Sequence, residues 1–239
     1  MRSQPVSTLS ENFRLSVVIP VFNEARTIAA VIARVRDTQL ASEILIVDDG
    51  STDGTRQLLE EYAASADVRV ILHDRNQGKG AALKTGFLQA TGNIVLVQDA
   101  DLEYNPADYP QLLAPILAGT ADVVFGSRFA QVGPQSLKRS LHTFGNRFIT
   151  FCSNRFTGLR LTDMETCYKV FRREILAQIA PRLVEKGFGI EPELTARLAR
   201  LPKLRLKEVP ISYTARGYAE GKKINARDAL WALWCVIRY

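Results

Sequence analysis

Three carboxylates follow one short apolar run at every second position. The stretch NIVLVQDADLEYNP covers residues 93–106, and Asp99, Asp101 and Glu103 come directly after its apolar residues 94–97. If the strand stays extended there, residues two apart point the same way, and their carboxylates repel each other unless a cation lies between them. Mg²⁺ and Mn²⁺ prefer oxygen ligands, often one or two carboxylates together with substrate phosphates. The spacing therefore predicts a site for Mg²⁺ or Mn²⁺.

A second acidic stretch, VDDGSTDGT at residues 47–55, follows another apolar run. Its acids nearly match the spacing of an EF-hand calcium loop, but that motif requires a helix before the loop, and residues 44–47 have a strand pattern. A strand-to-helix turn whose acid holds a ligand fits better. The carboxylate of Asp49, for example, can accept N–H bonds from a nucleobase.

A glycine-led helix start, NQGKGAALKTG at residues 76–86, carries Lys79. Free backbone N–H groups and the helix dipole attract anions such as a diphosphate to such a position. The stretch is not a Walker loop, which needs G-x-x-x-x-G-K-[ST], and it lacks the third glycine of the dinucleotide fingerprint. Beside a predicted metal site, it indicates contact with a phosphate.

Strands that alternate with helices must position these groups. The apolar strands predict an α/β fold with a mostly parallel sheet and helices on both faces. Ligands bind at the carboxyl ends of the strands in such sheets, so we expect the acidic turns to meet along one edge. The expected strands are 14–20, 43–51, 68–74, 93–99 and 121–128, and the expected helices are 27–37, 53–64, 78–90 and 112–117.

The charge is divided unevenly along the chain. Residues 1–126 hold 10 Lys and Arg against 16 Asp and Glu, whereas residues 127–239 hold 21 against 9. An acidic half suits a cation, and a basic half suits phosphates of lipids or nucleic acids. No nucleic-acid-binding motif occurs, so nucleic acid is not an expected partner. Three scattered cysteines favour a reducing compartment, and neither a signal-peptide pattern nor an apolar run of about 18 residues is present.

Two segments in the basic half are amphipathic. Residues 137–156 place Phe144, Phe148 and Phe151 at helical spacing with arginines between them, and residues 226–239 combine two tryptophans with two arginines. Each segment alone fits either a core-facing helix with a basic outer face or a helix in a membrane interface. Tryptophan beside arginine is typical of the interface, and the pair of segments favours that interpretation.

Taken together, VVIPVFNEARTI, IVDDGSTDGT, NQGKGAALKTG, QDADLEYNP and GSRF resemble family 2 glycosyltransferases, whose fold is the Rossmann-like GT-A fold. The resemblance covers roughly residues 14 to 225. DMETCYKVFRREIL and EVPISYTARGYAEGKKI are similar to polyprenyl-phosphate sugar transferases, such as dolichyl-phosphate glucosyl- and mannosyltransferases. The implied organisation is a flexible tail (1–12), a GT-A domain (13–225) with a nucleotide-sugar and metal half (13–128) and an acceptor half (129–225), and a C-terminal amphipathic segment (226–239).

The resemblance also implies roles for individual residues. Nucleotide-sugar binding falls to Pro20, Phe22, Glu24, Asp49, Lys79, Asp99, Lys222 and Lys223. Metal binding falls to Asp99, Asp101 and Glu103, and binding of the acceptor phosphate to Arg128, Arg139, Ser140 and Arg216. The implied catalytic residues are Asp101, Asp163, Arg128 and Arg139.

The implied reaction is an inverting, metal-dependent transfer of a sugar from a nucleotide-diphosphate sugar to a polyprenyl or dolichyl phosphate. Glu103 stands where related mannosyltransferases often have Gln, which favours a UDP-glucose-like donor and leaves GDP-mannose and UDP-N-acetylglucosamine open. A lipid phosphate, with a second pKa of roughly 6, needs no general base. A hydroxyl acceptor would need one, for which Asp163 is the first candidate and Glu165 and Glu191 are weaker ones.

Two other functions remain open from the sequence. One is a family 2 glycosyltransferase that acts on a hydroxyl of a glycan or small molecule, and the other is a non-catalytic module that binds a nucleotide or a phosphoinositide. For the lipid-directed enzyme we expect a cytoplasmic protein attached peripherally to the cytoplasmic face of a membrane. A membrane-protein partner or a homo-oligomer is compatible with the same surface.

Overall fold

The computed structural model describes residues 13–62, 64–130, 141–215 and 226–239. Its strands are β1 (Leu15–Val21), β2 (Ala41–Asp48), β3 (Val68–Leu72), β4 (Ile94–Val97), β5 (Val123–Ser127), β6 (Lys169–Arg172) and β7 (Leu206–Pro210). Its α-helices are α1 (Ile28–Asp37), α2 (Thr55–Glu60), α3 (Lys79–Gln89), α4 (Tyr109–Leu117), α5 (Leu141–Thr157), α6 (Arg173–Ile179), α7 (Ile190–Ala199) and α8 (Ala226–Arg238). Two short 3₁₀ helices are η1 (Pro106–Asp108) and η2 (Ala180–Arg182).

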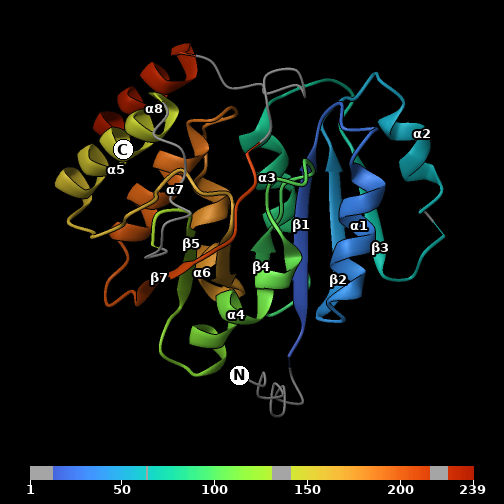
Figure 1. Ribbon diagram of the computed structural model, residues 1–239, viewed down its shortest axis with the longest axis horizontal. Helices are drawn as coiled ribbons and strands as arrows, with labels where there is room; N and C mark the ends of the chain where they lie inside the picture. Colours follow the sequence, from blue (N-terminus) through green and yellow to red (C-terminus); the bar gives the residue numbers. More distant parts are fainter. Residues whose placement is uncertain (1–12, 63, 131–140, 216–225) are drawn as a thin grey trace.

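The strands form one sheet in the order β3-β2-β1-β4-β6-β5-β7. Strand β6 runs antiparallel to both of its neighbours, and the other pairings are parallel. From β1 the chain passes through α1 to β2 and on to β3, and it then returns through α3 to β4 on the other side of β1. Because such crossovers are right-handed, α1 and α3 lie on opposite faces of the sheet. Figure 1 shows helices on both sides of the sheet. The prediction of a Rossmann-like, mostly parallel sheet is confirmed.

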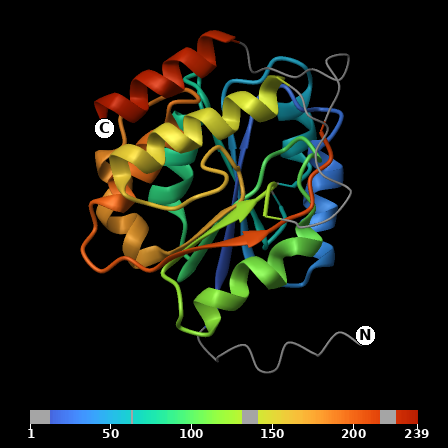
Figure 2. The same ribbon diagram turned by 60° about the vertical axis from the view of Figure 1, so that its left-hand side comes forward.

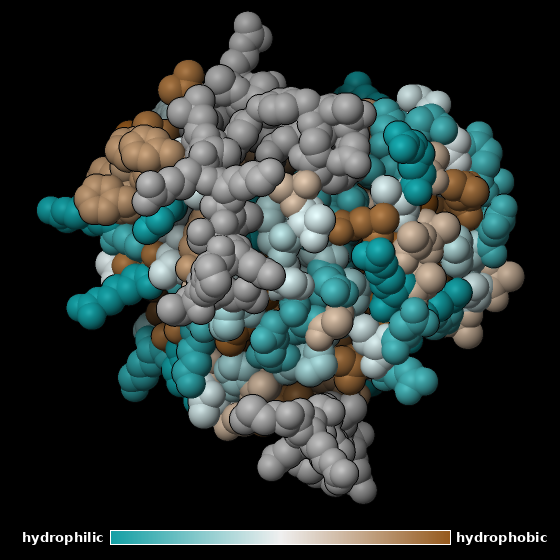
Figure 3. All heavy atoms as spheres, viewed as in Figure 1, coloured by the Kyte–Doolittle hydropathy of each residue, from teal (hydrophilic) through white to brown (hydrophobic). Residues whose placement is uncertain are grey.

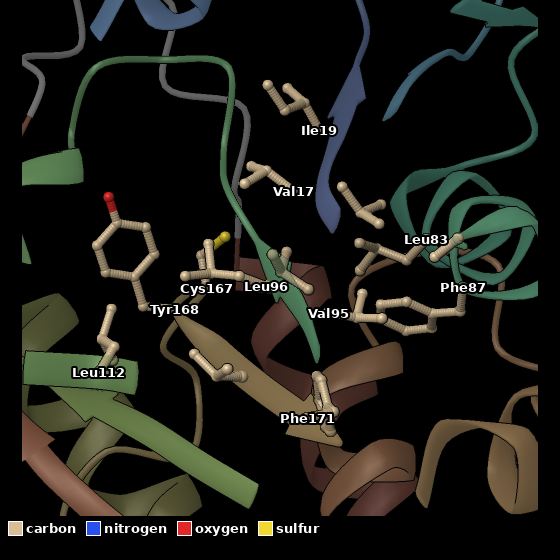
Figure 4. Packing of buried hydrophobic residues seen from close by; sticks show 14 of the residues in the cluster. Val17, Ile19, Leu83, Phe87, Val95, Leu96, Leu112, Cys167, Tyr168 and Phe171 are labelled. Carbon is tan, nitrogen blue, oxygen red and sulfur yellow. The ribbon is translucent and has the colours of Figure 1, made fainter. Parts of the chain in front are cut away.

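Buried side chains from both halves of the chain meet at the centre of this sheet. Figure 4 shows Leu83 and Phe87 of α3 on one side of β4 and Tyr168 on the other, with Phe171 of β6 below the strand. The rings of Phe87 and Phe171 meet edge to face at 5.8 Å. Helix α3 approaches β1 closely because Gly86 has no Cβ, which would otherwise lie 2.4 Å from Val18 Cγ1. Burial of such apolar side chains contributes roughly 1.5–3 kcal/mol each.

The strands end earlier than the sequence indicates. Strand β2 ends at Asp48 and β4 at Val97, so the acidic residues that follow them lie in turns. The sequence analysis assigned no strand after residue 128, and it missed β6, α6, α7 and β7. Strand β6 is only four residues long and begins and ends with basic residues, so its pattern is weak, yet it inserts between β4 and β5.

Helices α5 and α8 lie side by side over α7, which is almost wholly buried (Figure 2). The phenylalanines of α5 face away from the core, since Phe144 is 70% and Phe151 67% exposed, and Trp234 and Ile237 of α8 are exposed as well. Hydrophobic residues gather over these two helices in Figure 3. A core-facing position of the aromatic stripe is therefore excluded. No helix in the described parts of the chain has the length and apolar character needed to cross a bilayer.

Residues 1–12, expected as a tail, lie outside the described residues. The division of the chain at residues 128 and 225 remains a prediction. Within the described residues, α8 packs against α5 and α7, so the C-terminal segment is in direct contact with the part of the chain that follows residue 128.

Candidate active site

A cavity of about 980 Å³ lies at the carboxyl ends of β1, β2, β4 and β5. This is the edge at which ligands bind in open α/β sheets. Most of the described residues that the sequence assigned to a site line this cavity: Pro20, Phe22, Glu24, Asp49, Lys79, Asp99, Asp101, Glu103 and Arg128. Thr143, Asn146, Glu165 and Glu191 line it as well, so residues from both halves of the chain form one cavity.

The carboxylates after β4 lie on a turn, and the expectation of an extended strand through them is wrong. Strand β4 stops at Val97, and Leu102 has a φ of +64°. Gln98 is fully buried, and its Oε1 accepts hydrogen bonds from the hydroxyls of Tyr109 and Tyr168 at 2.8 and 2.7 Å. This buried contact fixes the point at which the acidic turn begins.

Lys79 provides the cation beside Asp99. Its Nζ lies 2.9 Å from Asp99 Oδ1 and 3.8 Å from a carboxylate oxygen of Glu191. Burial raises the pKa of Asp99, but the charge and hydrogen bond of Lys79, the hydrogen bond of Cys167 and the charge of Lys169 together outweigh it, so the pKa is held below its ordinary value. The first turn of α3 and the acidic turn are therefore joined by an ion pair.

The three predicted metal ligands do not form one cluster. Glu103 Oε2 accepts a hydrogen bond from the hydroxyl of Tyr213 at 2.8 Å, and Asp101 Oδ1 accepts one from the backbone N–H of Glu103 at 3.1 Å. Within the described residues, no three His, Cys, Asp or Glu side chains are placed to hold a metal ion. The residues present fit an ion held by one or two carboxylates and completed by substrate phosphates, with Asp101 as the carboxylate closest to this role.

Asp49 shapes the part of the cavity wall next to the loop before α3. Its buried carboxylate accepts hydrogen bonds from the backbone N–H groups of Gln77 and Gly78 and contacts His73 Nδ1 at 2.7 Å. Gly78 has a φ of +103°, a conformation that residues with a side chain rarely adopt. Since three donors occupy the carboxylate, Asp49 holds the loop before α3 in place, and its predicted contact with a nucleobase stays a prediction.

Arg128 is fixed by Asp163. The Nε and Nη2 atoms of Arg128 each lie 2.7 Å from an oxygen of Asp163, and the backbone N–H of Arg128 donates to the same carboxylate. Asp163 is completely buried, whereas Arg128 lines the cavity and lies over the ring of Tyr213 at 5.2 Å. This geometry does not support Asp163 as a general base, because its oxygens face the guanidinium and not the cavity. Asp163 positions Arg128.

The stretch DMETCYK brings further charged groups to the wall of the cavity. Lys169 is buried, pairs with Glu191 and donates to the carbonyl oxygens of Met164 and Thr166. Glu165 lines the cavity, and its Oε1 is buried without a hydrogen-bond partner among the described residues. Burial, reinforced by the charge of Glu191, raises the pKa of Glu165 to about 7.

Several residues of the cavity wall were missed by the sequence analysis: Tyr104, Thr143, Asn146, Cys167, Phe188 and Tyr213. Tyr213 lies inside the quoted stretch EVPISYTARGY, so its position in a matched motif was an available signal. The other predicted site residues, Arg139, Ser140, Arg216, Lys222 and Lys223, lie outside the described residues.

Known proteins resemble this chain in sequence and in fold. Undecaprenyl-phosphate mannosyltransferase from Micrococcus luteus is 33% identical over 218 residues, which cover 87% of each protein. Polyprenol monophosphomannose synthase from Mycolicibacterium smegmatis is 31% identical over 241 residues, 94% of this chain and 87% of that protein.

A solved structure shares the fold. Glucosyl-3-phosphoglycerate synthase from Mycobacterium tuberculosis, in complex with Mn²⁺, UDP and phosphoglyceric acid, matches with a TM-score of 0.71 at 21% identity. The match covers 95% of this chain and 78% of that one. The model of glycosyl transferase family 2 matches residues 16–180. The chain therefore belongs to glycosyltransferase family 2 and is a glycosyltransferase with the GT-A fold.

Proposed function

We propose that the enzyme transfers a sugar, with inversion and with a divalent metal ion, from a nucleotide-diphosphate sugar to a polyprenyl phosphate at a membrane surface. One observation carries the lipid acceptor: helix α5 lines the cavity and also carries an exposed aromatic face. Thr143 and Asn146 face the cavity, while Phe144, Phe148 and Phe151 are exposed. A phosphate at the end of a lipid can thus enter the cavity while its chain stays near an apolar surface.

The end of the cavity at Arg128 is called the acceptor end, and it suits a phosphate. Arg128 is held in one orientation by Asp163, and a planar guanidinium binds phosphate oxygens in a defined geometry. An acceptor phosphate is already ionised near neutral pH, so the reaction needs no general base. The buried position of Asp163, away from the cavity, is consistent with such an acceptor. The names of the two relatives, which specify undecaprenyl phosphate and polyprenol, support the same choice.

The reaction follows from these positions. An oxygen of the acceptor phosphate attacks the anomeric carbon, the bond from that carbon to the donor diphosphate breaks, and the diphosphate leaves with the electron pair. Attack from the face opposite to the leaving group inverts the anomeric configuration. Mg²⁺ or Mn²⁺, held by Asp101 and the diphosphate oxygens, would stabilise the negative charge that develops on the leaving group. Lys79 adds a positive charge at the same end of the cavity.

The face formed by Phe144, Phe148 and Phe151 of α5 and Trp234 and Ile237 of α8 is called here the apolar face. Exposed arginines accompany it on both helices: Arg147, Arg155 and Arg238. An apolar helix surface beside basic side chains binds membranes that contain anionic lipids. We propose that the enzyme attaches through this face to the cytoplasmic side of a membrane.

The chain's own motifs and the names of its relatives point to different donor sugars. The Glu103 and DMETCYK variants favour a UDP-glucose-like donor, whereas the names of both relatives specify mannose, which GDP-mannose would supply. Glu103 accepts a hydrogen bond from Tyr213, and both residues line the cavity, which supports a role for Glu103 in sugar selection. UDP-glucose, GDP-mannose and UDP-N-acetylglucosamine are therefore tested together.

The test is transfer of radiolabel from each of these donors into an organic-extractable product, with a short polyprenyl phosphate in vesicles and with Mn²⁺ or EDTA. We expect a mild-acid-labile lipid product from one donor, lost with EDTA and in Asp101→Asn. Asp74→Asn is the matched control, because Asp74 also follows a strand but is exposed and outside the cavity. If every label stays in the aqueous phase while metal-dependent nucleotide release continues, the lipid acceptor is wrong.

A further inference from the structure

We infer that Glu185 is a positioning residue that links helix α8, on the outer surface, to the donor end of the cavity. The donor end is the part of the cavity at Lys79 and Asp99. The link itself is independent of the proposed acceptor. We expect this link to make donor binding depend on the contact of α8 with a membrane, and that role rests on the proposed function.

Glu185 accepts hydrogen bonds from Trp231 of α8 and from Tyr239, the residue that follows the helix. Its Oε2 accepts from Trp231 Nε1 at 2.9 Å, and its Oε1 accepts from the hydroxyl of Tyr239 at 2.8 Å. Arg238 lies 3.9 Å from Oε1. The residue is only 8% exposed, so this carboxylate and its partners form a nearly enclosed contact. Hydrogen bonds to a charged group are the stronger kind, about 1.5–3 kcal/mol each.

The segment that carries Glu185 is fixed on α7. Glu193 is completely buried, and its carboxylate accepts hydrogen bonds from the backbone N–H groups of Val184 and Glu185 at 3.0 and 2.8 Å. Arg197 pairs with Glu193 on the other side at 2.6 Å. We therefore expect a displacement of α8 to move residues 183–189 as one unit, because many backbone N–H and C=O groups of this segment are hydrogen-bonded.

The other side of the segment lies directly against the first turn of α3. The carbonyl oxygen of Lys186 accepts a hydrogen bond from the backbone N–H of Ala81 at 3.1 Å. A Cβ at Gly80 would lie 2.3 Å from Glu185 O, and one at Gly78 would lie 2.3 Å from Lys186 O. Two backbones can meet this closely only through glycines. The position of the segment thus sets the position of the helix start that carries the Lys79–Asp99 ion pair.

The same segment ends in the cavity. Gly187 and Phe188 line its wall together with Glu191 of α7. A Cβ at Gly189 would lie 2.7 Å from both Cys235 Sγ of α8 and Glu185 Oε2, so this end of the segment is packed against α8 as well. Since packed interiors transmit displacement and compress little, α8, residues 183–189 and the first turn of α3 are expected to move together.

The chain contains a matched pair of variants for testing this link. Its two tryptophans lie one turn apart on α8, with similar exposure of 45% for Trp231 and 47% for Trp234, but only Trp231 donates to Glu185. We expect Trp231→Phe to weaken binding of UDP or GDP with Mn²⁺, without vesicles, by about 3- to 10-fold, a fraction of one charged hydrogen bond. Trp234→Phe is expected to change this affinity less than twofold.

Steady-state kinetics should show the same division. Trp231→Phe should raise the KM for the donor by a similar factor while kcat changes less than twofold, because the reacting groups are untouched. In a Glu185→Gln background, Trp231→Phe should have little further effect, since the charged acceptor is already lost. A merely structural contribution would lower the melting temperature and leave donor KM and nucleotide affinity unchanged, and that result would overturn the inference.

Each tryptophan can also report alone. In Trp234→Phe, the remaining Trp231 should change its emission when UDP or GDP with Mn²⁺ is added. In Trp231→Phe, the remaining Trp234 should shift to shorter wavelength with anionic phosphatidylglycerol vesicles and respond little to nucleotide. If Trp231→Phe fails to fold, the test is the emission of Trp231 in Trp234→Phe. An emission that does not change when nucleotide with Mn²⁺ is added would reject the link. A Trp231 response without vesicle binding or lipid product would reject the proposed function and keep the link.

Discussion

The donor end of the cavity is held by contacts between neighbouring elements of the chain, whereas the acceptor end is held by side chains that meet from far apart. Asp49 and Gly78 are 29 positions apart, and Lys79 pairs with Asp99 only 20 positions later. By contrast, Arg128 and Asp163 are 35 positions apart, and Glu103 and Tyr213 are 110 apart. Motifs named the residues that the first half of the chain brings to the donor end, but not residues 187–191, which reach it from the second half.

The same contrast appears in the charges. At the donor end, Lys79 in the first turn of α3 pairs with Asp99 of the acidic turn, and the further carboxylates Asp101 and Glu103 also line the cavity. At the acceptor end, buried Asp163 leaves Arg128 as the group that faces the cavity. The cavity therefore has one end that suits a cation with a diphosphate and one end that suits an anion.

The strongest way to break this comparison is Asp163→Asn. Removing one partner of a buried ion pair leaves Arg128 uncompensated, and we expect a loss of about 3–5 kcal/mol in the free energy of unfolding. Transfer should fall by about 100-fold with a raised KM for the acceptor, measured alongside denaturant unfolding. A fall in kcat with an unchanged acceptor KM and an unchanged stability would instead favour Asp163 as a general base.

A pH series on Glu165→Gln tests the charge at the wall between the two ends. Burial raises the pKa of Glu165 from 4.5 to about 7, so the folded protein keeps a proton that the unfolded chain releases. The wild-type free energy of unfolding should therefore fall, relative to the variant, as pH rises from 4.5 through 7, by up to about 3 kcal/mol. Parallel stability curves for the two proteins would contradict the raised pKa.

The apolar face of the acceptor half can be tested by itself. We expect the double variant Phe144→Ser, Phe151→Ser to bind anionic vesicles at least tenfold more weakly, since each phenylalanine contributes about 2 kcal/mol when it leaves water. Leu72→Ser is the control, because Leu72 is a half-exposed apolar residue of the edge strand β3. Vesicle co-sedimentation measures the effect, and equal loss in the control would show that the apolar face has no special role.

The smallest expected effect comes from Tyr213→Phe. This change removes the hydrogen bond to Glu103 and keeps the ring that lies beside Arg128. We expect a loss of about 1 kcal/mol, that is five- to tenfold in kcat/KM, and a changed preference among the donor sugars. The same donor panel measures it, and an unaltered preference would remove Glu103 from the specificity of the enzyme.

Prediction from sequence worked best where local pattern and burial agree. The apolar strands before residues 48 and 98 gave the fold class and the edge at which the cavity forms. It was less complete after residue 128, where β6 is short and flanked by charge, and where β7 is only half-buried. It also carried the strand to Asp99, two residues beyond its end at Val97, because the apolar pattern does not record where a strand gives way to a turn.

By itself the sequence determined the family, the α/β class, the acidic and basic halves and many of the residues that come to the cavity. Only the tertiary structure decided which partner each charge has. Lys79 takes Asp99, Asp163 is enclosed behind Arg128, and Glu185 is reached by α8 from more than 40 positions away. The physical reason is that an ion pair or hydrogen bond needs atoms within about 3 Å, a condition set by the packing of distant segments and not by the residue types alone.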